Sequence, residues 1–141
     1  MATLGMITLV VDDYDRALAY YVDGLGFTLV EDTVLDSDQR WVVVAPSSGG
    51  ARLLLARARG EQQVAAIGNS VGGRVAYFLY TDDFDATYAR FSAAAVEFIE
   101  EPRTERWGRV VVFRDLYANG WDLIETGSAS GGRSATGHAP N

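Results

Sequence analysis

Few side chains in this sequence have the chemistry to act on a ligand, and the strongest candidate is Asp122. The 141 residues contain no Cys, one His and twelve cations that are all arginine. These counts exclude a thiol nucleophile, an iron–sulfur cluster, a Cys-type zinc site and a lysine Schiff base. Asp122 stands among large apolar residues, where burial without a partner is costly and raises the pKa of a carboxyl. It could serve as an acid, a base, an anchor for a cationic ligand, or a structural partner of Arg114 or Arg57.

Two other groups of side chains have both a functional and a structural interpretation. Phe78 and Tyr80 could stack on a planar ligand, although aromatic residues at strand spacing also build cores. Five aspartates follow strand-like segments and precede helix-like ones, which favours helix caps over an acidic binding cluster. They are Asp12, Asp13, Asp82, Asp83 and Asp85.

The charge balance narrows the class of partner. Twelve basic and 19 acidic residues give a net charge of -7, and nucleic-acid binding needs a basic patch. The acid excess favours neutral or cationic ligands. Every apolar run is too short to cross a membrane, and the first five residues do not resemble a signal peptide. We therefore expect a cytoplasmic protein that binds neither nucleic acid nor membranes.

The elements that must position these side chains alternate between strand and helix patterns. A helix is predicted after the Asp13 cap and ends near Gly24, and a short helix is predicted over 62–67. Asn119-Gly120 predicts a tight hairpin turn. The predicted strands are Met6–Val11, Phe27–Asp32, Trp41–Ala45 and Arg52–Ala56, then 76–80, 96–100, Arg109–Arg114 and Trp121–Glu125.

The second half of the chain repeats the first. A shift of seventy positions lays Leu9 on Leu79 and Asp13 on Asp83, and later Val42–Val44 falls on Val110–Val112. A long period that occurs twice indicates a duplicated unit. We predict an α+β fold with one domain, residues 1–126, made of two tandem βαβββ modules. The modules are 5–57 and 74–126, the linker is 58–73, and the tail 127–141, with His138, is expected to be disordered.

Three segments resemble the vicinal oxygen chelate superfamily, which includes glyoxalase I, extradiol dioxygenases, fosfomycin-resistance transferases and bleomycin-binding resistance proteins. The segments are 9–21, with its Asp-Asp-Tyr-Asp run, 24–27 and 113–125. The resemblance covers about residues 5–126. It implies that the two modules curl their strands into a curved mixed sheet, a cup around one ligand.

The resemblance also implies where a divalent metal would bind in catalytic relatives. The four ligand positions, on the first and fourth strands of each module, fall on Met6, Leu54, Ala76 and Asp122. A hard divalent ion would accept only Asp122, whereas a catalytic site needs about three protein ligands. We therefore expect no metal and no other cofactor.

Strand alternation predicts the side chains that line this cup, because every second residue shares a face. Ile7, Leu9 and Val11 are expected to pack beneath a helix. The predicted lining is mostly apolar, as in small-molecule sites. It consists of Met6, Thr8, Val10, Leu54, Ala76, Phe78, Tyr80, Asp122 and Ile124.

These observations predict a small-molecule-binding protein without the catalytic metal. Its ligand is expected to be cationic or aromatic, as for a bleomycin-binding protein, and two chains are expected to form a homodimer that completes the cups. The alternative is a glyoxalase-like lyase or isomerase, a transferase or a dioxygenase-like enzyme. Asp122 would be its catalytic group, with or without a divalent metal. A third class is a partner domain of a larger assembly.

Overall fold

The computed structural model describes residues 1–47 and 49–127. The chain forms two compact units, Met1–Gly68 and Asn69–Asn141, which we describe separately. The predicted disordered tail, 127–141 with His138, lies outside the described residues apart from Gly127. Within the described ranges, no helix is long and apolar enough to cross a membrane.

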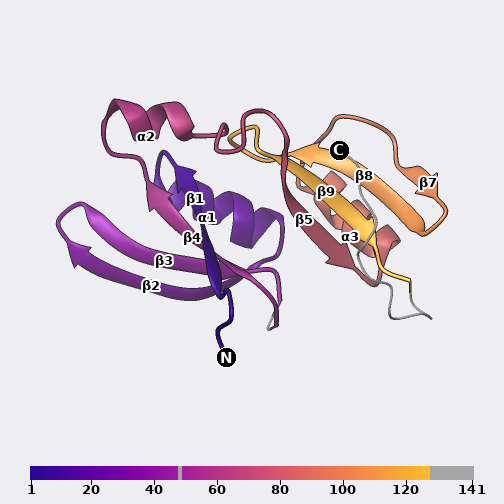
Figure 1. Ribbon diagram of the computed structural model, residues 1–141, viewed down its shortest axis with the longest axis horizontal. Helices are drawn as coiled ribbons and strands as arrows, with labels where there is room; N and C mark the ends of the chain where they lie inside the picture. The colour runs from indigo at the N-terminus through magenta and orange to yellow at the C-terminus, as the bar shows by residue number, and fades with distance from the viewer. Residues whose placement is uncertain (48, 128–141) are drawn as a thin grey trace. The chain divides into compact units, whose positions relative to one another are not determined.

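The first unit is a four-stranded sheet with a helix packed on one face. The strand order is β1-β4-β3-β2, in which β1 and β4 are parallel and the other neighbours antiparallel (Figure 1). Its elements are β1 (Met6–Val11), α1 (Tyr14–Leu18), the π-helix η1 (Ala19–Gly24), β2 (Thr28–Asp36), β3 (Gln39–Ala45), β4 (Arg52–Arg57) and α2 (Gly60–Ala66).

The core of this unit lies between the sheet and α1. Leu9, Val11 and Leu55 are buried from the strands, and Ala17 and Tyr21 are buried from the helical segment. The predicted inward face is therefore present, except that Ile7, near the start of β1, is 41% exposed. The Asp13 side chain accepts a hydrogen bond from the Arg16 backbone N–H, which caps α1 as predicted.

The second unit repeats this design with a broken strand. The order is β5-β9-β8-β6, with β7 also paired to β8, and β5 and β9 are parallel (Figure 1). Helix α3 packs on one face of the sheet, where the centroids of the Phe91 and Phe113 rings are 5.3 Å apart. The elements are β5 (Val75–Thr81), α3 (Phe84–Ala93), β6 (Glu97–Phe98), β7 (Arg103–Glu105), β8 (Gly108–Arg114) and β9 (Gly120–Glu125).

The observed α+β architecture agrees with the predicted fold class, with one change in the internal alignment. Val42 pairs with Leu55 in the first sheet, and Val111 pairs with Leu123 in the second. Leu55 and Leu123 are equivalent, because they pair with Leu9 and Leu79. Val42 therefore corresponds to Val111, and the predicted alignment of Val42–Val44 on Val110–Val112 is wrong by one residue.

The predicted tight turn at Asn119-Gly120 is also wrong. Strand β8 ends at Arg114, and Gly120 already pairs with it as the first residue of β9. The connection is the five-residue segment 115–119, in which Ala118 has the positive φ of 70°. The Asp115 carboxylate fixes this loop, because it accepts hydrogen bonds from the backbone N–H groups of Tyr117 and Asn119.

The repeated aspartates tie each helix to its sheet. Arg40 of β3 lies over the Tyr14 ring and pairs with Asp15 and Asp32. At the corresponding position of the second unit, Arg109 of β8 lies over the Phe84 ring and pairs with Asp85 and Glu125. These contacts support the structural interpretation of Asp85 as a group that holds a helix start.

Candidate functional site

Asp122 is a buried carboxylate in the middle of the second sheet. It lies on β9, where its register partners are Phe78 of β5 and Val112 of β8. Asp122 is 1% exposed, and neither carboxylate oxygen has a hydrogen-bond partner among the residues that the structure describes. A buried polar group without a partner is uncommon and costly, which makes Asp122 a candidate site residue.

Asp115 shows what a structural buried aspartate looks like in the same unit. It is 5% exposed, and its carboxylate accepts four hydrogen bonds. The donors are the backbone N–H groups of Tyr117 and Asn119, the Asn119 side-chain amide and the Trp121 indole. The unit thus satisfies one buried carboxylate fully and leaves the Asp122 oxygens unsatisfied.

The arginines proposed as structural partners of Asp122 bind elsewhere. Arg114 pairs with Glu97 at 3.7 Å, and Arg57 pairs with Asp38 at 3.9 Å. The arginine that influences Asp122 electrostatically is Arg103 of β7, which the sequence analysis did not single out.

Arg103 is itself held by two other carboxylates. Its Nε donates to both Glu100 oxygens, at 3.0 and 3.2 Å, and Nη1 donates to Glu105 at 2.8 Å. Glu100 also accepts the Val112 backbone N–H at 2.9 Å, in the gap between β6 and β7. The Glu100 side chain therefore replaces a backbone acceptor for the Val112 N–H, while the Val112 carbonyl still accepts the Ile99 N–H at 3.1 Å. The signal in the sequence is Pro102, because proline cannot donate to a sheet ladder.

This environment shifts the pKa of Asp122 upward. Burial of the carboxylate is the main cause and raises its pKa to about 6, while the Arg103 charge partly opposes the shift and the Glu100 charge adds to it. A carboxyl that titrates near neutrality can exchange protons or bind a cation under ordinary conditions.

The predicted aromatic residues lie on the same sheet face as Asp122. Phe78 is 44% exposed and Tyr80 49% exposed, so neither is a core residue. Ile124 pairs with Tyr80 in register and is buried between β5 and β8. Ala76 is half-buried at an irregularity, since Val75 pairs with Gly120 and Tyr77 with Trp121.

The predicted residues of the first unit share the sheet face opposite its core. Thr8 pairs with Leu54 in the parallel β1–β4 register. Thr8 is exposed, whereas Met6, Val10 and Leu54 are half-buried. The two units are thus alike in presenting one open sheet face each, and within these predicted residues Asp122 provides the ionisable carboxylate.

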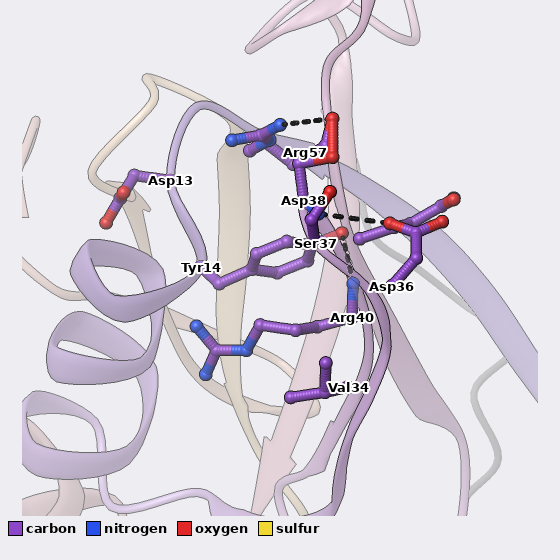
Figure 2. A pocket seen from close by; sticks show the side chains of 9 residues that line it. Asp13, Tyr14, Val34, Asp36, Ser37, Asp38, Arg40 and Arg57 are labelled. Carbon is purple, nitrogen blue, oxygen red and sulfur yellow. Dashed lines mark hydrogen bonds and ion pairs between the residues drawn. The ribbon is translucent and has the colours of Figure 1, made fainter.

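A separate recess of about 250 Å³ lies in the first unit, between the start of α1 and the β2–β3 turn (Figure 2). Figure 2 shows Arg40 running beneath the Tyr14 ring and Arg57 beside Asp38. Its charged groups are largely engaged with one another, as Arg40 is with Asp32. None of the predicted site residues lines it. Its walls are Asp13, Tyr14, Val34, Asp36, Ser37, Asp38, Gln39, Arg40 and Arg57.

The donor set does not fit the divalent metal of catalytic relatives. At the four inferred positions, Leu54 and Ala76 offer no donor atom and Met6 offers a soft thioether, which hard ions do not prefer. In residues 1–47 and 49–127, no group of three His, Cys, Asp or Glu side chains is arranged to bind a metal. We therefore derive no chemistry through a metal.

Comparison with known proteins gives the family of this chain. Residues 3–123 match the model of the Glyoxalase/Bleomycin resistance protein/Dioxygenase superfamily. An uncharacterized protein of Shewanella frigidimarina (strain NCIMB 400) is 50% identical over 121 residues, covering 84% of this chain and 90% of the relative.

Solved structures agree with this match. A superfamily member from Sphaerobacter thermophilus DSM 20745 is 30% identical, with a TM-score of 0.67 and coverage of 89% of this chain and 98% of that one. TnmS3, an antibiotic binding protein from Streptomyces sp. CB03234, is 27% identical, with a TM-score of 0.72 and coverage of 90% and 98%. This chain therefore belongs to the Glyoxalase/Bleomycin resistance protein/Dioxygenase superfamily.

Proposed function

We propose that this protein binds a small organic molecule without a catalytic metal, in the manner of an antibiotic-binding member of the superfamily. The observation that supports this function is the open face of the second sheet, where exposed Phe78 and Tyr80 of β5 lie beside the buried Asp122 carboxylate, which has no hydrogen-bond partner among the described residues. An apolar surface with few polar anchors is typical of small-molecule sites. The similarity to TnmS3, which is described as an antibiotic binding protein, favours an antibiotic as the ligand.

Thermal unfolding with a panel of antibiotics tests this function. The panel contains charged and uncharged compounds, including the basic glycopeptide bleomycin. A compound at about 100 times its Kd stabilises the native state by about 2.7 kcal/mol, so a true ligand should raise Tm by several degrees. The proposal fails if no compound in the panel shifts Tm and none binds by calorimetry.

Metal analysis of the purified protein tests the metal-independent part of the proposal. We expect substoichiometric metal as isolated, and no tight binding of nickel, zinc, iron(II) or manganese, because the family positions lack donors. Ligand binding should be unchanged after chelator treatment. One tight equivalent per chain would contradict this part.

The enzyme alternative is favoured by one observation, the raised pKa of Asp122. A carboxyl with a pKa of about 6 suits general acid–base catalysis near neutrality. The first assay is hemithioacetal isomerisation, for which we expect no turnover above background. If turnover is found and Asp122→Asn abolishes it while ligand binding persists, the protein is an enzyme rather than a pure binder.

We also propose a homodimer, located in the cytoplasm. The edge strand β2 supports self-association, because all nine of its residues are exposed and they include Val34 and Leu35. Exposed apolar edge strands tend to pair with other chains. Sedimentation analysis should give twice the chain mass, and Val34→Lys should lower that mass if β2 forms the contact. Cell fractionation tests the location.

A further inference from the structure

We propose that Asp122 forms an ion pair with the cationic nitrogen of a planar aromatic ligand that stacks on Phe78 and Tyr80. This inference rests on the proposed function and specifies the ligand class of that site. It follows from the orphaned carboxylate, the charges around it and the exposed rings beside it.

Arg103, the arginine that influences Asp122, is held by ion pairs with other carboxylates. Arg103 donates to Glu100 through Nε and to Glu105 through Nη1, and Glu100 is fixed in turn by the Val112 N–H. With these partners, Arg103 makes no hydrogen bond to the Asp122 oxygens, which have no partner in the described parts of the chain. Glu100 therefore acts as a positioning residue that keeps Arg103 away from the Asp122 oxygens, which are buried and would have to be uncovered for an external partner.

The net charge around Asp122 selects a cation. Asp122, Glu100 and Glu105 contribute three negative charges when ionised, and Arg103 contributes one positive charge, so the cluster has a net charge of about -2. A protonated amine or amidinium would satisfy the buried carboxylate, whereas an anion would be repelled. Tyr80 of β5 shares this face. Arg114 of β8 does so as well, and because it pairs with Glu97 of β6, this pair leaves the net charge unchanged.

The spacing of the rings fits a planar molecule. Phe78 and Asp122 are register partners on neighbouring strands, which are about 4.8 Å apart. Tyr80 lies two residues further along the same strand, and hence on the same face. A ligand stacked on these exposed rings would therefore have its edge close to the carboxylate.

Fluorescence titration with two matched probes tests this inference. 9-Aminoacridine is a planar cation in mildly alkaline buffer, whereas acridine has the same ring system without the charge. We expect 9-aminoacridine to bind about 10- to 100-fold more tightly, which is the effect of a charge-assisted hydrogen bond. Its affinity should fall as the pH is lowered through the pKa of Asp122, about 6.

Three variants separate the ion pair from general charge effects. Asp122→Asn should bring the two probes to nearly equal affinity. Glu100→Gln should weaken 9-aminoacridine binding by releasing Arg103 toward Asp122, since a glutamine oxygen can still accept the Val112 N–H. Glu101→Gln is the control, because it removes one charge from an exposed neighbouring residue and should leave both affinities unchanged.

Equal affinity of the two probes, or an Asp122→Asn variant that binds 9-aminoacridine like the parent, would overturn the inference. The same holds if neither probe binds while an uncharged antibiotic of the panel does, and in that case the proposed binding function stands. If no probe and no antibiotic binds at all, the proposed function fails together with the inference.

Discussion

Asp115 and Asp122 are both buried in the second unit, and they differ in the hydrogen bonds that their carboxylates accept. Asp115 accepts four hydrogen bonds, three from its own loop and one from Trp121 of β9. Asp122 accepts none from residues 1–47 and 49–127, and its charged form is therefore destabilising in the native state. In the proposed function, the ligand supplies the partner that the described residues do not provide.

Replacing Asp122 by Asn should stabilise the protein at neutral pH. The native pKa of about 6 exceeds the ordinary value of 3.8, so the native state binds more protons than the unfolded state between these values. The parent protein loses stability as the pH rises through this window, and the Asn variant does not. The difference, 6 minus 3.8 units at 1.36 kcal/mol each, is about 3 kcal/mol at pH 7.

Denaturant unfolding at several pH values measures this effect. The advantage of the Asn variant should be complete above about pH 7 and vanish below the ordinary pKa of 3.8. Asp115→Asn serves as the opposite case, because it weakens bonds to the Asp115 carboxylate and should destabilise by about 1–3 kcal/mol. Equal losses from both substitutions would contradict the distinction between the two residues.

At the scale of elements, the repeated aspartates cap and anchor the helices. The Asp83 side chain accepts the Ala86 N–H at 3.1 Å at the start of α3. We predict that Asp83→Ala lowers the free energy of unfolding by about 1 kcal/mol, the usual value of an N-cap. The neighbouring Asp82→Ala removes the same charge from an exposed residue and should have little effect. Similar losses from both would mean that charge, rather than capping, is responsible.

Most elements could be predicted from the sequence because their signals are local. The strand at Met6–Val11 is found within its predicted bounds, and Asp13 caps the helix that follows. Alternation of apolar residues and cap chemistry act over a few positions, so they can be recognised without knowledge of the rest of the chain.

What could not be predicted depends on contacts between distant segments. The burial of Asp122 follows from its apolar neighbours, but its lack of a partner depends on Glu100 and Arg103, which reach β8 across the break near Pro102. The prediction of a tight turn at Asn119-Gly120 was wrong for a related reason, because the Asp115 carboxylate stabilises a longer loop. A side chain that accepts a hydrogen bond from a backbone N–H cannot be recognised from the pattern of apolar residues in the sequence.

At the scale of the molecule, the two units contain sheets with corresponding strand pairings. Leu9 pairs with Leu55 in one unit as Leu79 pairs with Leu123 in the other. The open faces differ, because the position of Asp122 in the second unit corresponds to Leu54 in the first. The two units thus share these strand pairings, while the buried carboxylate at this position is found in the second unit.

Equivalent core residues of the two units should contribute similar and independent amounts to the free energy of unfolding. Val42 and Val111 are equivalent residues, each 0% exposed in its own sheet. Val42→Ala and Val111→Ala should each cost about 1–3 kcal/mol, because both remove buried methyl groups. The two residues pair with different strands and belong to different units, so the double variant should show the sum of the single losses within about 0.5 kcal/mol. Denaturant unfolding of the four proteins measures this sum, and a larger deviation would mean that the two cores are energetically coupled.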